Sequence, residues 1–327
     1  MSVTILAPAT APVRAFSLMG FSKAQVWALV VLVVLIVACP WLIYPISLMR
    51  LLCFALFACA FNLLIGYVGL MSFGHAAYFG MGAYVTAWTA KNWGLTPEVS
   101  VVLGGVTGAA LGLAFGWLAI RRQGIYFAMI TLALGQMVAF FCVQAPFTGG
   151  EDGIQGVPRG ALFGLISLKS DMAMYAAVAA VFLVCFLLIH RIVHSPFGQV
   201  LKAIRENEPR ATSLGYRTDD YKLIAFVLSA GFAGIAGGMN ALVVGLSTLT
   251  NVQNPLSGEV VLMALLGGMG TIFGPVVGAG IIVATETALA QADMWVKVLQ
   301  GTIFVVCVLA FRRGVVGEIG HRLRINL

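Results

Sequence analysis

The sequence predicts an all-α fold, a polytopic membrane helix bundle of about ten segments. Of the 327 residues, 61% are hydrophobic and 9% are charged, whereas roughly 25% of the residues in an average soluble domain are charged. Residues 51–90 contain no Asp, Glu, Lys or Arg, although one helix needs only about 20 apolar residues to cross a bilayer. This stretch must cross twice or break inside the membrane, and the composition excludes an ordinary soluble domain.

The remaining segments follow in order from the apolar runs, which cover residues 24–49, 99–120, 123–150, 172–190, 223–258, 260–285 and 294–311. Turn-forming residues are expected to divide the long runs at Gly66 and Gly69, at 251–255 and at 267–275. No small-residue cleavage site follows the first run. Residues 24–43 are therefore expected to be retained as the first helix.

Lysine and arginine residues predict the orientation, because cytoplasmic loops carry an excess of them. With a cytoplasmic N-terminus and ten crossings, all of the 19 fall on the cytoplasmic side except Arg50, Lys91, Arg159, Lys169 and Lys297. Both termini are then cytoplasmic, with residues 1–23 as an N-terminal segment, 24–312 as the transmembrane domain and 313–327 as a tail. The net charge of +7 reflects this topology, so no nucleic-acid partner is expected.

Glycines 66, 69 and 74 mark a break inside the long uncharged run. A helix is interrupted at membrane depth only where the freed backbone faces protein or a water-filled path. The segment is therefore a candidate lining for a route through the membrane. The predicted lining residues are Asn62, Gly66, Gly69, Ser72, Gly74, His75 and Glu286.

Two of these residues are also compatible with a purely structural role, since ionisable groups inside a membrane can stabilise helix packing. His75 lines the route or makes a hydrogen bond between helices, and Glu286 contacts the solute or is a satisfied structural acid. A second glycine group at Gly267, Gly270 and Gly274 resembles the first break, as internal repeats do in many transporters. Chance similarity among the 38 glycines is the alternative.

Glycines also recur four residues apart at 104, 108, 112 and 116. Small residues at this spacing let membrane helices approach closely. The stripe therefore predicts a tightly packed bundle.

Two polar loops interrupt the apolar pattern. The external loop, residues 145–171, is rich in turn formers and is either a landing place for an external partner or an ordered connection. The internal loop, residues 191–222, predicts two short helices, one capped by Ser195 before Pro196 and one that starts near Asn207 and ends at Gly215. Both are expected to be amphipathic, so the loop is either a docking surface or lies on the inner leaflet.

Catalytic and cofactor chemistry is not expected. No Lys follows a Gly anywhere in the chain, so the phosphate-binding loop of an ATPase is missing. The six cysteines lie in apolar runs without a Cys-x-x-Cys pair, which indicates packing. His190 and His194 lack a third metal ligand, and Ser72 with His75 does not make a hydrolase.

Four blocks of sequence resemble the permease subunits of branched-chain amino acid ABC importers, the LivM-like branch. They are Asn62 to Tyr84, Arg122 to Ala133, Thr148 to Gly153, and Lys202 to Leu223. The resemblance extends over roughly residues 45 to 315. Leu70 departs from it where many relatives carry Gln, and Pro209 stands where a small residue is common.

The resemblance implies a bacterial inner-membrane importer with a second homologous permease, two cytoplasmic ATP-binding subunits and a periplasmic solute-binding protein. It also implies a bundle similar to the cobalamin-importer type of permease. The internal loop would then dock the ATPase. Its coupling residues would be Arg205, Glu208, Ala211 and Gly215.

Several functions stay open on the sequence alone. The solute is a branched-chain or other amino acid, or else urea, a short amide or a small aromatic acid. The rival from another class is an autonomous secondary carrier or channel, which would need ion sites in the membrane. The scarcity of intramembrane acids and the structured internal loop favour the ABC permease.

Overall fold

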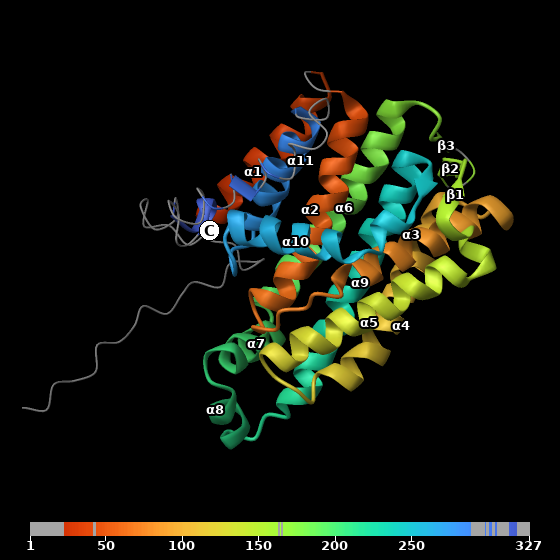
Figure 1. Cartoon of the computed structure of the whole chain (residues 1–327). Helices are drawn as coiled ribbons and strands as arrows, with labels where there is room; N and C mark the ends of the chain where they lie inside the picture. The colour runs from red at the N-terminus through yellow and green to blue at the C-terminus, as the bar shows by residue number, and fades with distance from the viewer. Residues whose placement is uncertain are drawn as a thin grey trace, which may run out of the picture.

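The computed structural model describes residues 23–41, 44–162, 164, 166–288, 298, 301–302, 305 and 314–318. This part of the chain is mostly helical, and the helices pack into one elongated bundle (Figure 1). The apolar helices are α1 (Lys23–Ala38), α2 (Pro45–Ile65), α3 (His75–Asn92), α4 (Pro97–Ala119), α5 (Ile125–Gln144), α6 (Asp171–His194), α9 (Thr218–Val244), α10 (Asn254–Gly267) and α11 (Gly274–Ala288).

Shorter elements connect these helices. The internal loop forms α7 (Pro196–Glu206) and α8 (Glu208–Ser213). The 3-10 turns are η1 (Cys39–Trp41), η2 (Pro146–Thr148), η3 (Gly150–Asp152) and η4 (Leu249–Asn251). The strands are β1 (Ile154–Gln155), β2 (Ala161–Leu162), β3 (Ile166–Ser167) and β4 (Leu246–Ser247), paired antiparallel as β1 with β4 and β2 with β3.

The predicted helical membrane bundle is confirmed. Five helices, α2, α4, α5, α6 and α9, are long and apolar enough to cross a membrane, and α1, α3, α10 and α11 fall on four more of the expected segments. The tenth segment, 294–311, lies mostly outside the described residues, as do the two terminal segments. Ten crossings and the likeness to the cobalamin-importer bundle therefore stay predictions.

The core forms around α2 and α9, which are largely buried. Helix α9 packs against α2, α3 and α4, while α2 also contacts α6, α10 and α11. The glycine stripe of α4 faces α9, because a Cβ atom on Gly108 would lie 2.5 Å from the carbonyl oxygen of Ala230. Likewise, a Cβ atom on Gly234 would lie 2.5 Å from the carbonyl oxygen of Gly104. The tight packing expected from this stripe is confirmed.

The two polar loops lie at opposite ends of the bundle (Figure 1). At the end with the strands, Arg159 pairs with Asp171 at 2.6 Å, and Lys91 donates a hydrogen bond to the carbonyl oxygen of Gln155 at 2.8 Å. These contacts show that the 145–171 loop is an ordered connection over its described residues. Its role as a landing place for a partner stays a prediction.

A reporter experiment tests the predicted orientation. Gly124 and Gln155 lie beyond opposite ends of α5, so reporters inserted beside them should report opposite faces. We expect a phosphatase reporter to be active near Gln155, and inactive near Gly124 and after Leu327. Activity with the reverse pattern would contradict the orientation derived from lysine and arginine placement.

Candidate functional site

The first glycine break follows α2 and is a tight reversal of the backbone. The amides of Val68, Gly69 and Leu70 all donate to the carbonyl oxygen of Leu64, at 3.1, 3.0 and 3.3 Å. Gly69 has a φ of 84°, a conformation that L-residues with side chains rarely adopt. The break therefore ends α2 with three backbone amides gathered on the carbonyl oxygen of Leu64.

Asn62 joins this break to the second one. Its side-chain nitrogen donates to the carbonyl oxygen of Thr271 at 2.9 Å, and its side-chain oxygen accepts from the amide of Gly270 at 3.0 Å. The backbones approach closely, since a Cβ atom on Gly66 would lie 2.7 Å from the nitrogen of Gly270. The two glycine groups that look alike in the sequence thus lie side by side, held by one buried amide.

Arg205 connects α7 to both breaks. Its guanidinium donates to the carbonyl oxygen of Gly66, and a Cβ atom on Gly270 would lie 3.0 Å from its Nη1. Lys202, one turn earlier, places its ammonium 5.7 Å from the centre of the Tyr67 ring. Partial burial lowers the pKa of Lys202 below its usual value. A cavity of about 420 Å³ opens here and is lined by Gly66, Tyr67, Lys202, Arg205, Glu206 and Gly270.

The later part of the first break faces α5. Gly69, Leu70, Met71 and Phe73 line a cavity of about 470 Å³, together with the stretch of α5 and its preceding loop from Gly124 to Leu132. The cavity walls are mostly apolar. Of the predicted lining residues, Gly69 lines this cavity. Leu70, Met71 and Phe73 also line it, although they were not predicted to.

His75 lies in the packed core instead of on a cavity. It is fully buried, its Nε2 lies 3.0 Å from the Oγ of Ser229, and Phe57, Phe61, Tyr78 and Phe226 surround its ring. This geometry matches the helix-packing alternative, since Ser229 in turn donates to the carbonyl oxygen of Ala60 on α2. Ser72 is also fully buried.

Glu286 does not join the site. It lies near the end of α11, 12 residues beyond Gly274, which corresponds to about 18 Å along a helix axis. Its side chain is half-buried. The structure therefore separates Glu286 from the breaks at the start of α11.

Gly74 is a packing residue, which leads to a testable result. A Cβ atom there would collide with the backbone carbonyl of Thr131 on α5, so Gly74→Leu must displace α5. We expect overpacking to cost at least about 1–3 kcal/mol and the variant to reach the membrane at reduced abundance without transport. Gly280→Leu is the matched control, because nothing lies within 4 Å of its Cβ position. Normal abundance and uptake of Gly74→Leu would contradict this result.

The predicted helices of the internal loop are present with their caps. The Oγ of Ser195 accepts from the amide of Gly198 at 3.3 Å, and the Oδ1 of Asn207 accepts from the amide of Arg210 at 3.0 Å. Gly215 ends α8 with a φ of 92°. Helix α7 buries Leu201 and Ile204, so its apolar face packs against the bundle instead of against lipid.

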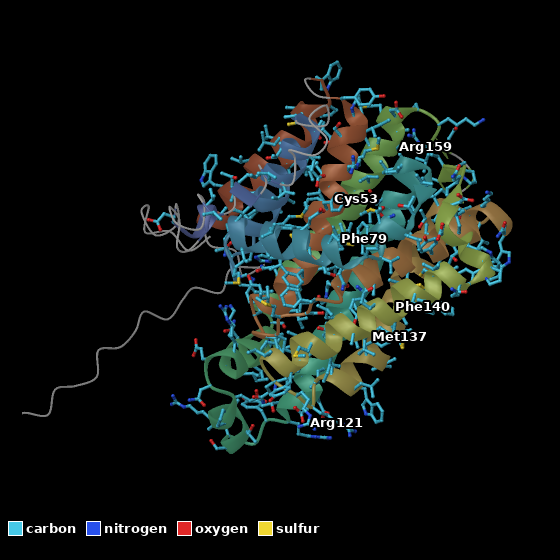
Figure 2. All side chains as sticks on the ribbon, viewed as in Figure 1. Cys53, Phe79, Arg121, Met137, Phe140 and Arg159 are labelled. Atoms are coloured by element: carbon cyan, nitrogen blue, oxygen red, sulfur yellow. The ribbon has the colours of Figure 1, made fainter. Side chains whose placement is uncertain are left out.

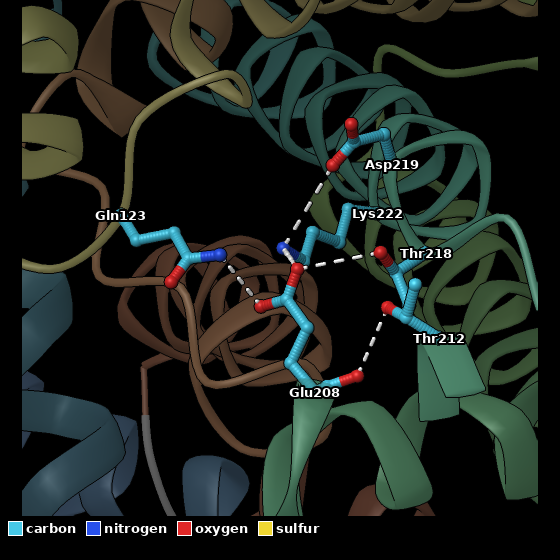
Figure 3. A network of polar contacts seen from close by, with 6 residues as sticks. All are labelled: Gln123, Glu208, Thr212, Thr218, Asp219 and Lys222. Carbon is cyan, nitrogen blue, oxygen red and sulfur yellow. Dashed lines mark hydrogen bonds and ion pairs between the residues drawn. The ribbon is translucent and has the colours of Figure 1, made fainter. Parts of the chain in front are cut away.

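Glu208 is the centre of a polar network (Figure 3). Its carboxylate pairs with the ammonium of Lys222, accepts from the hydroxyl of Thr218 at 3.3 Å, and accepts from the amide of Gln123 at 2.9 Å. Three elements meet there: α8, the start of α9 and the loop between α4 and α5. Glu208 thus holds α8 against the start of α9 and the loop between α4 and α5.

The outer surface of α8 is formed by other residues. Ala211 is buried at 2% exposure and packs α8 inward. The exposed side chains at the tip are those of Pro209, Arg210, Thr212, Ser213, Leu214 and Tyr216. The four predicted coupling residues therefore have different places. Arg205 contacts the first glycine break, and Glu208 holds α8 against α9. Ala211 is a buried residue of α8, and Gly215 reverses the chain after it. The sequence did not identify the three partners of Glu208, which are Gln123, Thr218 and Lys222. Only Lys222 had a visible signal, because a lysine directly before the uncharged run 223–258 is expected to need a charged partner.

The chain is similar in sequence to known membrane transport proteins. The sequence model of the family described as branched-chain amino acid transport system / permease component matches residues 43–308. The high-affinity branched-chain amino acid transport system permease protein LivM of Escherichia coli K12 is 28% identical over 317 residues, covering 89% of this chain and 74% of LivM. LivH of Salmonella typhimurium LT2 is 25% identical over 289 residues, covering 81% of this chain and 91% of LivH.

A third relative is named for a different substrate. The autoinducer 2 import system permease protein LsrC of Salmonella paratyphi B is 27% identical over 197 residues, covering 58% of this chain and 54% of LsrC. No solved structure gives a significant match.

Proposed function

The chain belongs to the family of branched-chain amino acid transport system permease components, and we propose that it forms half of the route by which an ATP-driven importer moves branched-chain or other amino acids across the bacterial inner membrane. The chain is a permease subunit, and ATP is hydrolysed on a partner. The family match over residues 43–308 carries this conclusion.

The internal loop supports ATPase docking by this chain. Its two helices are capped, and they are fixed to the bundle by Glu208 and Arg205. Polar and apolar side chains of α8 remain exposed at the tip. A rigid helix with a free outer surface is suited to seat in a groove of another protein.

The proposed partners follow from this assignment. They are a second homologous permease, two cytoplasmic ATP-binding subunits, a periplasmic solute-binding protein and the surrounding membrane lipid. In this arrangement both termini are cytoplasmic and the strand-bearing 145–171 loop faces the binding protein. The proposed function requires neither a metal nor a cofactor in this chain.

We place the solute route beside the first break and α5. The cavity along Gly69 to Phe73 supports this placement. Farther along α5, Met137 and Phe140 are exposed at 56% and 68% (Figure 2). Exposed apolar residues on a membrane helix fit either a neighbouring subunit or lipid. Asn62 and Gly66 would act through the backbone breaks, while His75 would stabilise the packing behind them.

The solute class is the open part of the proposal. LivM and LivH are named for branched-chain amino acids, whereas LsrC is named for autoinducer 2, so relatives differ in substrate. Urea, short amides and small aromatic acids are the alternatives for this chain. A thermal-shift screen of the cognate binding protein against these classes distinguishes them.

Reconstitution tests the function directly. We expect the chain to co-purify with an ATP-binding subunit, and vesicles that hold both permeases to take up solute only with ATP, ATPase and binding protein present. Uptake by this chain alone, driven by an ion gradient, would overturn the proposal in favour of a secondary carrier.

A further inference from the structure

Helix α4 presents a continuous apolar face to the outside of the bundle. Its exposed large side chains include Val99, Val102, Val106, Leu113 and Trp117. From the first to the last of these the helix rises about 27 Å, close to the roughly 30 Å of a bilayer core. This face therefore matches the hydrocarbon of the membrane, and Trp117 stands where the polar interface begins.

Two arginines follow directly at this boundary. Arg121 and Arg122 are both exposed, and the guanidinium of Arg121 stacks over the Trp117 ring with 4.8 Å to its centre. Figure 2 shows Arg121 at the end of the bundle away from Arg159. Among the described residues, the ion pairs of basic side chains involve Arg159, Arg217 and Lys222.

The neighbouring carboxylate is already engaged. Gln123 contacts Glu208, but the carboxylate of Glu208 pairs with Lys222 and accepts from Thr218. In the described part of the chain, no acid therefore neutralises the two arginines. They form a local excess of positive charge at the depth of the lipid headgroups.

A cavity joins the charged and apolar parts. It has a volume of about 550 Å³ and is lined by Trp117, Leu118, Arg121, Arg122 and Ile130. One wall thus offers guanidinium groups, which bind phosphate oxygens through paired N–H donors. The other wall offers hydrocarbon from α4 and α5.

We propose that this cavity binds one anionic phospholipid, with its phosphate at Arg121 and Arg122 and its acyl chains along Leu118 and Ile130. A basic pocket between membrane helices at headgroup depth is suited to such lipids. The inference requires that the chain spans a membrane, but it does not depend on the ATPase, the solute or the orientation. Its failure and that of the proposed function are therefore distinguishable.

Trp117 supplies a local reporter for the test. The full chain is placed in vesicles that contain phosphatidylglycerol or phosphatidylcholine with brominated acyl chains, which quench nearby tryptophan fluorescence. The signal of Trp117 is the difference between the wild type and Trp117→Phe. We expect the phosphatidylglycerol preference of that signal to fall on the order of tenfold in Arg121→Gln/Arg122→Gln.

Matched variants keep the test decisive. Arg121→Lys/Arg122→Lys should retain most of the preference, and Arg217→Gln, which removes an exposed arginine at α9, should leave it unchanged. Equal quenching by both lipids in the wild type would overturn the proposal. So would loss of the preference on adding inorganic phosphate, which indicates a free-phosphate site. A double glutamine variant with unchanged lipid preference but lost ATPase binding would also overturn it and indicate a protein contact.

Discussion

Glu208→Lys is expected to abolish ATP-driven uptake while the chain still inserts into the membrane. The substitution places a second cation against Lys222, whose side chain is only 2% exposed. Removing one partner of a buried ion pair typically costs about 3–5 kcal/mol. The contacts from Gln123 and Thr218 are lost as well. Helix α8 should therefore separate from α9, and ATPase binding should fall with it.

The measurements are membrane abundance, co-purification of the ATP-binding subunit and uptake in vesicles. The charge swap Glu208→Lys/Lys222→Glu is the control, because it restores the opposite charges in the same place, and we expect it to recover part of the binding and uptake. Glu208→Gln should be intermediate, since an amide oxygen still accepts from Thr218. Full coupled uptake by Glu208→Lys would show that the position of α8 does not govern docking.

Local features of the internal loop were predictable from sequence. The helix caps of Ser195 and Asn207 are hydrogen bonds to a backbone amide three residues further along the chain. The chain reversal at Gly215 depends on the φ of that residue itself. The apolar helices were predictable for a similar reason, because the length of an uncharged run is a property of neighbouring residues. Both kinds of signal are short in range.

The contacts that build the site are not of this kind. Asn62 reaches Gly270 and Thr271 across more than 200 positions of the chain, and Arg205 reaches Gly66 across 139. The sequence showed that the two glycine groups were alike but not that they touch. The family resemblance implied Glu208 as a coupling residue, whereas the structure turns its carboxylate toward Lys222.

His75 illustrates how an intramembrane ionisable group is ambiguous in sequence. Its place in a glycine-rich break is compatible both with lining a route and with a hydrogen bond that packs two helices together. Only the neighbours decide between them, and here they are aromatic rings from α2, α3 and α9 together with the hydroxyl of Ser229. These residues come from three separate stretches of the chain, so no pattern in one stretch identifies them.

Arg205→Gln is expected to separate ATP hydrolysis from transport. Arg205 lies on α7, where its guanidinium holds the carbonyl oxygen of Gly66 and lies against Gly270. Hydrogen bonds to charged groups contribute roughly 1.5–3 kcal/mol, which corresponds to about ten- to hundredfold in the equilibrium between linked and released forms. The variant should bind the ATPase and hydrolyse ATP, while uptake falls by at least about tenfold.

The comparison between the two variants distinguishes docking from transmission. Glu208→Lys should lose the ATPase, because it displaces α8, whereas Arg205→Gln should keep it, because the caps and the network of α8 are untouched. Arg217→Gln is the control for removing a positive charge from the same loop, and Arg205→Lys should retain part of the uptake through its shorter single donor group. Loss of ATPase binding by Arg205→Gln would place α7 in the docking surface itself. Retained binding with lost uptake would identify Arg205 as the residue through which motion of the docked loop reaches the two glycine breaks.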